Sequence, residues 1–115
     1  MKISEFEAVC DAKRLTAGDS DREITAGYTC DLLSHVMGRG QAGMAWITVQ
    51  THMNVIAVAS LLDFACVIVP EGLPVEAPIL SKADEEGIVV LSSGKTAFEL
   101  VTILAAHGVG PVSCA

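Results

Sequence analysis

Three short apolar segments alternate with three helical patterns along much of this chain, and that alternation constrains the fold more than any other feature. The apolar segments span residues 45–50, 65–69 and 88–91, and the helical patterns span 54–62, 76–86 and 93–104. Strands that alternate with helices form parallel sheets with right-handed crossovers. A continuous apolar strand such as 65–69 is typical of a sheet that is covered on both faces.

We therefore predict a single three-layer α/β domain, with a mainly parallel sheet of about four to five strands flanked by helices. The domain comprises residues 1–115, with a core at about 2–108 and a C-terminal tail at 109–115. The remaining elements expected from the residue pattern are a helix at 4–10, short strands at 13–16 and 22–26, and a helix at 29–37. The predicted N-caps are Thr29, Asn54 and Ser93.

The charge of the chain excludes several classes of partner. Its formal net charge is -7, and its seven Lys and Arg residues form no cluster. Such a chain lacks the basic face that nucleic acid requires, and it is poorly suited to a membrane surface. Its apolar runs are too short for a membrane span of about 20 residues, and the N-terminus lacks the apolar core of a signal peptide. We expect a cytoplasmic protein that binds neither nucleic acid nor membrane, with enough apolar surface for an oligomer interface.

Cysteine and histidine residues predict neither a metal site nor a cofactor. The four cysteines form no Cys-x-x-Cys pair, and the three histidines lie on different expected elements. Cys66 is expected in the core and Cys10 on a helix face, whereas Cys114 lies in the tail. Cys30 is the one cysteine beside the candidate site described below.

Two strings of residues resemble nucleotide-binding motifs without meeting their structural conditions. Residues 38–43 match Gly-x-Gly-x-x-Gly, but the string follows a predicted helix and precedes a strand, the reverse of the order that a dinucleotide site needs. Residues 94–96 are the last three letters of a phosphate loop, but Val89 stands where that loop requires its first glycine. We interpret the first string as a turn and the second as a helix start that can still hold one anionic group.

Small and polar residues at the predicted strand ends form the candidate ligand site. In open α/β folds, ligands bind at the carboxyl edge of the parallel sheet. The expected ligand-binding residues are Thr25, Gly27, Asp31, Thr51, His52, Asn54, Ser92, Ser93, Gly94 and Thr96. Asp31 is also explained as an acidic residue in the first turn of a helix. His52 has three interpretations: polar lining of a cleft, a structural hydrogen bond, or metal binding or catalysis. No complete catalytic constellation is found, so we predict no catalytic residues.

The segment Asp21-Arg22-Glu23-Ile24-Thr25-Ala26-Gly27 resembles the signature of the DRTGG domain family, with Ala26 in place of a glycine. The blocks at 27–37, 46–48 and 54–59 are similar to the blocks that follow it in that family, and the resemblance covers about residues 2–108. Members are regulatory modules of phosphotransacetylases and of pyrophosphatases that contain CBS domains, or small stand-alone proteins, some encoded near iron hydrogenases. The resemblance implies a fold similar to the N-terminal domain of HPr kinase, dimerisation, and a regulatory rather than a catalytic role.

Residues and resemblance together favour a non-catalytic regulatory or ligand-sensing homodimer. The expected ligand is a small molecule that bears phosphate, such as an adenine nucleotide, since helix N-termini offer amide donors to anions. The alternative is a protein-interaction or scaffold subunit of a metabolic complex, for example one associated with a hydrogenase. An enzyme that uses His52 is a third alternative, and it requires a carboxylate within hydrogen-bonding reach of the imidazole.

Overall fold

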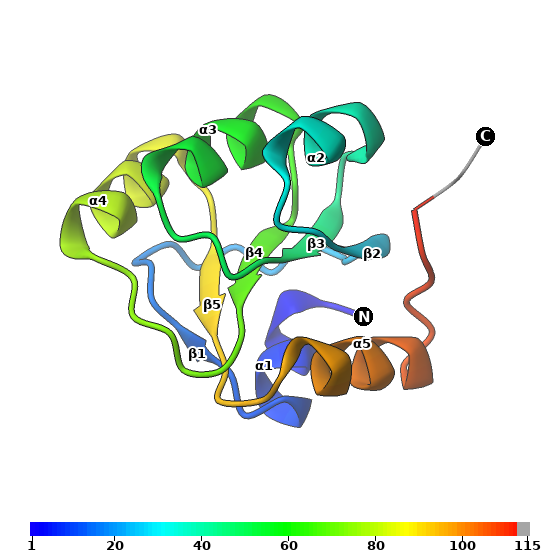
Figure 1. The fold of residues 1–115 in the computed structure, drawn as a ribbon. Coiled ribbons are helices and arrows are strands. Elements are labelled where there is room, and N and C mark those ends of the chain that lie inside the picture. The colour runs from blue at the N-terminus through cyan, green and yellow to red at the C-terminus, as the bar shows by residue number, and fades with distance from the viewer. Residues whose placement is uncertain (113–115) are drawn as a thin grey trace.

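A five-stranded sheet lies between two layers of helices in the computed structural model, which describes residues 1–112 (Figure 1). The strands are β1 (Lys13–Arg14), β2 (Ala26–Thr29), β3 (Met44–Ile47), β4 (Cys66–Val69) and β5 (Val90–Ser92). The helices are α1 (Ile3–Val9), α2 (Leu33–Arg39), α3 (Met53–Leu61), α4 (Ala77–Glu86) and α5 (Ala97–Ala106). The strand order is β1-β5-β4-β3-β2, with β2 to β5 parallel and β1 antiparallel to β5. The predicted fold class is confirmed.

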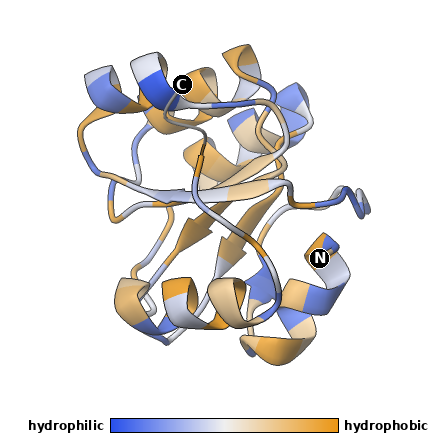
Figure 2. Ribbon diagram, turned by 90° about the vertical axis from the view of Figure 1, so that its right-hand side faces the viewer, coloured by the Kyte–Doolittle hydropathy of each residue, from blue (hydrophilic) through white to orange (hydrophobic). Residues whose placement is uncertain are grey.

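The crossovers from β2 to β5 all step in one direction across the sheet, which places their helices on one face. Figure 1 shows α2, α3 and α4 above the sheet and α1 and α5 below it. Alternate residues of each central strand enter the two apolar cores: Trp46 faces the α2–α4 layer, and Ile47 faces α1 and α5. The central strands are mostly hydrophobic (Figure 2), as expected for a sheet buried on both faces. None of the helices within residues 1–112 is long and apolar enough to span a membrane.

The strand predicted at 22–26 is wrong, because β2 begins at Ala26. Residues before Ala26 are held by distant parts of the chain: the Arg22 guanidinium contacts the Asp63 carboxylate at 2.8 Å, and Glu23 forms an isolated bridge with Lys2. As a result, Thr29 lies within β2 and caps no helix. The following helix, α2, begins at Leu33.

Two other predicted N-caps are also wrong, one by two positions and one by three. His52, not Asn54, is the N-cap of α3, and Thr96, not Ser93, is the N-cap of α5. Ser93 lies three residues before that cap, where its buried hydroxyl donates to the carbonyl oxygen of Cys10 at 3.1 Å and accepts from the Lys95 N–H at 3.2 Å. Thr96 instead forms a capping box with Glu99, in which each side chain accepts a hydrogen bond from the backbone N–H of the other residue.

Residues 109–112 pack against the sheet beside β2. The N–H of Gly27 donates to the carbonyl oxygen of Gly110 at 2.9 Å, and Gly27 forms a parallel bridge with Pro111. Val109 and Val112 are buried. This segment covers part of the outer edge of β2, whereas Cys114 and the rest of the predicted tail lie outside the described residues.

Candidate functional site

The parallel strands end at the carboxyl edge of the sheet. The loops that follow them lead to helices on either face of the sheet. The loops after β2, β3 and β4 lead to one face, whereas the loop after β5 leads to α5 on the other face (Figure 1). A crevice is expected where neighbouring loops diverge in this way, between β4 and β5. There the loops bond to each other, with Glu71 N–H donating to the Lys95 carbonyl at 2.8 Å and Gly72 N–H to the Ser93 carbonyl at 2.9 Å. Backbone therefore closes the position where a ligand would be expected.

Asp31 connects the loop after β2 to the loop after β3. Its Oδ1 accepts hydrogen bonds from Thr48 Oγ1 and from Val49 N–H, both at 2.9 Å. Gln50 Nε2 donates to the Asp31 carbonyl oxygen at 3.3 Å. Asp31 precedes α2 and does not lie in its first turn, so the helix-dipole interpretation is wrong. The carboxylate holds two loops together and satisfies the hydroxyl of Thr48, which is only 1% exposed.

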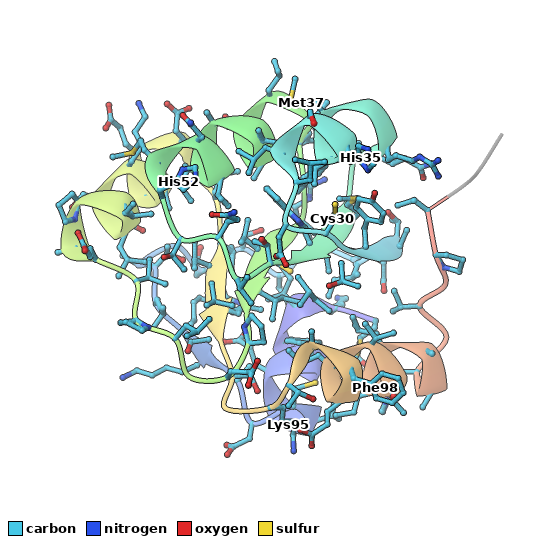
Figure 3. The ribbon with its side chains drawn as sticks, viewed as in Figure 1. Cys30, His35, Met37, His52, Lys95 and Phe98 are labelled. Atoms are coloured by element: carbon cyan, nitrogen blue, oxygen red, sulfur yellow. The ribbon has the colours of Figure 1, made fainter. Side chains whose placement is uncertain are left out.

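Thr51, His52 and Asn54 lie together at the start of α3. Thr51 and His52 border a crevice of about 10 Å³ against the apolar core, which has room for one water molecule at most. Within residues 1–112 the His52 ring forms no ion pair with a carboxylate, and no group of three or more metal-ligating side chains occurs. His52 and Asn54 are exposed, and Figure 3 shows His52 on the α2–α4 layer.

The segment from Ser92 to Thr96 is largely committed to holding the chain together. Ser92 ends β5, and Ser93 Oγ accepts from Lys95 N–H at 3.2 Å while donating to Cys10. Gly94 is exposed. The Glu99 carboxylate accepts hydrogen bonds from the backbone N–H and the side chain of Thr96, and these bonds hold the pKa of Glu99 below its ordinary value. A negative charge therefore already occupies the N-terminus of α5, where an anionic ligand would bind.

Thr25 lies at the opposite, amino edge of the sheet, so the expectation that it meets the other site residues is wrong. Its hydroxyl donates to the Ala42 carbonyl at 3.2 Å, and its N–H donates to the Gly43 carbonyl at 3.0 Å. The error follows from placing the strand four residues too early. Gly27 lies inside β2 and faces α5, where a Cβ would meet Leu104 and Val109 at 3.7 Å.

The residues at the start of the DRTGG-like segment also hold the fold together. Asp21 accepts hydrogen bonds from the backbone N–H and the hydroxyl of Ser4 at 2.8 and 2.9 Å, which fixes the start of α1. These bonds hold the pKa of Asp21 below its ordinary value, with the backbone bond as the larger cause. Arg22 pairs with Asp63 beyond α3. These partners are remote in sequence, so the segment gave no sign of them.

The Gly-x-Gly-x-x-Gly string is a turn, as interpreted from its order. It begins at Gly38 in the last turn of α2 and ends at Gly43, immediately before β3. A Cβ at Gly40 would lie 2.5 Å from Cζ of Phe64, and a Cβ at Gly43, whose φ is +82°, would lie 2.7 Å from Oγ1 of Thr25. Both glycines are required by close packing rather than by a phosphate group.

A groove of about 620 Å³ lies between β2, α5 and residues 108–111, and Gly27 is the one predicted site residue in its lining. Its lining includes Thr29, Val101, Ala105 and Pro111, and it contains no charged residue. Phe98, on α5, is 82% exposed, and Val101 is 41% exposed. We call this region the α5 groove. Sequence reasoning missed it because its wall consists mostly of glycine and apolar residues, which carry no recognisable chemistry.

The cysteines within the described residues show little sign of reactivity. Burial raises the pKa of the Cys66 thiol to about 12 and that of the Cys10 thiol to about 11. Both are therefore thiols, not thiolates, at neutral pH. Cys66 is fully buried among the core residues, which confirms its core interpretation. Cys30 is half-buried, and its Sγ lies 3.6 Å from the Leu32 carbonyl oxygen.

No protein-family model matches the chain, and no curated protein matches it. Among solved structures, it is similar to the crystal structure of the CBS and DRTGG domains of the regulatory region of Clostridium perfringens pyrophosphatase, complexed with the activator diadenosine tetraphosphate. The TM-score is 0.68 at 13% identity, and the match covers 89% of this chain but only 45% of that one. At this identity the likeness shows the fold, which is consistent with the DRTGG-like domain that residues 21–27 led us to expect.

Proposed function

We propose that this chain is a regulatory module without a catalytic site, which acts as a homodimer and senses a small molecule that bears phosphate. Two lines of argument support it. The pyrophosphatase region of similar fold is regulatory and binds a nucleotide activator. In addition, several polar side chains at the strand ends are used to hold the fold together and are not free for catalysis. Asp31 binds Thr48, and Ser93 binds Cys10. Among residues 1–112, a nucleophile, a base and its orienting group are not brought together.

The start of α3 is the part of the predicted site that remains available to a ligand. Within residues 1–112, the side chains of Thr51, His52 and Asn54 form no hydrogen bond with the protein, in contrast to Ser93, Thr96 and Asp31. Backbone N–H groups at a helix start and an adjacent imidazole suit a phosphate group. This availability is the observation that carries the sensing proposal.

Calorimetry and thermal unfolding with a ligand panel test the proposal. The panel contains AMP, ADP, ATP, diadenosine tetraphosphate and inorganic phosphate. A true ligand at 100 times its Kd stabilises the folded state by about 2.7 kcal/mol. The double variant His52→Ala/Asn54→Ala should lose the response, whereas His35→Ala, which removes an exposed imidazole from α2, should keep it. Absence of any response at millimolar concentration would contradict sensing.

A protein-interaction or scaffold subunit is the second candidate, and the α5 groove favours it. The groove is apolar and lacks charged residues, a composition closer to the core of an interface than to a phosphate site. Under this alternative, the tagged protein should retain one specific protein from native extract without added ligand. Phe98→Glu should abolish that retention, and the variant at His52 and Asn54 should not.

A further inference from the structure

The exposed face of α5 changes from large to small along its length. Phe98, Val101 and Ala105 are spaced at i, i+3 and i+7, so they share one face of the helix. Phe98 is the most exposed of the large apolar residues in the described chain, at 82%. At the other end of the helix, Ala105 is followed by Gly108 and Gly110, which line the α5 groove.

A face that is large at one end and small at the other is complementary to itself when two copies pair antiparallel. Phe98 and Ala105 are seven positions apart, which corresponds to a rise of about 10.5 Å along the helix. If two α5 helices cross antiparallel near Val101 and Thr102, Phe98 of each copy lies over Ala105 of the other, at the mouth of its groove. Such a contact is isologous and closes as a dimer with two-fold symmetry.

The charge of the chain also favours a second copy as the occupant. Two chains of net charge -7 repel each other, so a face with few charges is the most favourable place for them to associate. The α5 groove has no charged lining residue, and Glu99 is the one charged residue of α5. Glu99 lies off the stripe of Phe98, Val101 and Ala105, and its carboxylate is held in the capping box by Thr96.

Phe98 would be the main contributor to the buried contact area. A buried phenylalanine covers about 150–250 Å², so two Phe98 rings supply a substantial part of the roughly 1,200 Å² that a stable interface buries. The remainder would come from Val101, Ala105 and the groove walls of both copies.

We propose that the α5 groove is the self-association surface of this protein, with Phe98 of each copy seated in the groove of its partner. This inference rests on the homodimer of the proposed function and names its interface. The opposite layer, formed by α2, α3 and α4, stays free, so the start of α3 is accessible in both copies (Figure 3).

Light scattering and analytical ultracentrifugation of matched variants test this interface. The wild-type chain should be a dimer at micromolar concentration, and Phe98→Glu should weaken association by roughly 100-fold or more, as for a central hot-spot residue. Leu61→Glu is the matched control, because Leu61 is 69% exposed on α3, in the opposite layer. It should dimerise normally. Circular dichroism checks that each variant is folded.

An exchange of large and small residues provides a second test that introduces no charge. Ala105→Phe alone should fill the groove and prevent association, and Phe98→Ala alone should weaken it. The double variant Phe98→Ala/Ala105→Phe should recover dimerisation, because each large side chain again faces a small one.

The outcomes separate the interface from the proposed function. A dimer that survives Phe98→Glu but dissociates with Leu61→Glu overturns the interface and leaves the homodimer standing. A wild-type chain that remains monomeric at millimolar concentration overturns both the interface and the homodimer. The nucleotide response is measured independently at the start of α3, so its loss bears on sensing alone.

Discussion

The two sides of β2 differ sharply in how their residues are used. On the side toward β3, side chains and backbone are bonded to one another: Thr25 to Ala42, Trp46 Nε1 to the Cys30 carbonyl at 2.8 Å, and Asp31 to Thr48. On the outer side, a backbone bond joins Gly27 to Gly110, and beyond it lies the apolar α5 groove. The inner side holds the fold together, whereas the outer side leaves an apolar groove that no part of the described chain fills.

This difference shows why recognisable sequence did not point to the proposed contact surface at the α5 groove. The DRTGG-like segment, the glycine string and Asp31 all carry conspicuous chemistry, and all of them serve packing or loop attachment. The groove carries no conspicuous residue apart from the neighbouring Phe98. The predictions below are therefore designed to find whether the inner side governs stability while the outer side does not.

On the inner side, the largest effect is expected at Gly40, which precedes β3 and lies against the Phe64 ring. Gly40→Ala should lower the free energy of unfolding by about 3 kcal/mol, because the new Cβ would lie 2.5 Å from Phe64. The Phe64 ring is buried and packs edge-on against Trp46, so it has little room to move. Urea denaturation measures the change.

Gly38→Ala is the matched control, since a Cβ there meets no atom within 4 Å. It should stabilise the protein by up to about 0.5 kcal/mol, as alanine does in a helix. Equal losses at both glycines would show that backbone flexibility, rather than packing, matters in this string.

A smaller effect is expected at Asp31. Asp31→Ala should cost about 1–2 kcal/mol, because it leaves the buried Thr48 hydroxyl and the Val49 N–H without their acceptor. Asp31→Asn keeps one acceptor oxygen and should cost less. If thermal unfolding finds both variants as stable as wild type, the hydrogen bonds of Asp31 to the loop after β3 do not contribute to the free energy of unfolding.

On the outer side, Phe98→Ala should change the stability of the dilute monomer by no more than about 0.5 kcal/mol, because the ring is mostly exposed. Leu100→Ala, on the buried face of the same helix, should cost about 2–5 kcal/mol. At high concentration the wild-type Tm should rise with protein concentration, whereas that of Phe98→Ala should not. A large loss in the dilute Phe98 variant would contradict the distinction between the two sides.

The smallest effect is expected in the acid dependence of stability, and it concerns Asp21, the first residue of the DRTGG-like segment. The folded state lowers the pKa of Asp21 below its ordinary value of 3.8, chiefly through the bond from the Ser4 backbone. The resulting stabilisation is fully present above that value and is lost as the pH falls through the lower, folded pKa. Asp21→Asn should therefore reduce the loss of stability between pH 4 and about pH 2. An unchanged acid profile would show that the Ser4 bonds contribute nothing.

The sequence predicted the regular part of the fold and misplaced the residues whose partners are remote. The strand at 65–69 and the helix at 76–86 follow from apolar runs and helical spacing, and both occur nearly as predicted. Ser93 was misassigned as a cap because its partner, Cys10, lies 83 residues away. Thr25 was placed at the wrong edge because residue 22 pairs with Asp63 instead of entering the sheet, so that β2 begins only at Ala26. The α5 groove is formed by residues from distant parts of the chain, so no local sequence pattern indicates it.

The chain closes its sheet at both edges with segments taken from its two ends. Strands β2 to β5 each pair with a neighbour that is close in sequence, whereas β1 pairs with β5, and residues 110–111 with Gly27, across most of the chain. Contacts between distant residues carry a greater entropic cost, so we expect the four parallel strands to assemble first and the two closures last. Residues 108–111 also form one wall of the α5 groove. The groove is thus among the last surfaces to form, and a partner that requires it would bind only chains that have finished folding.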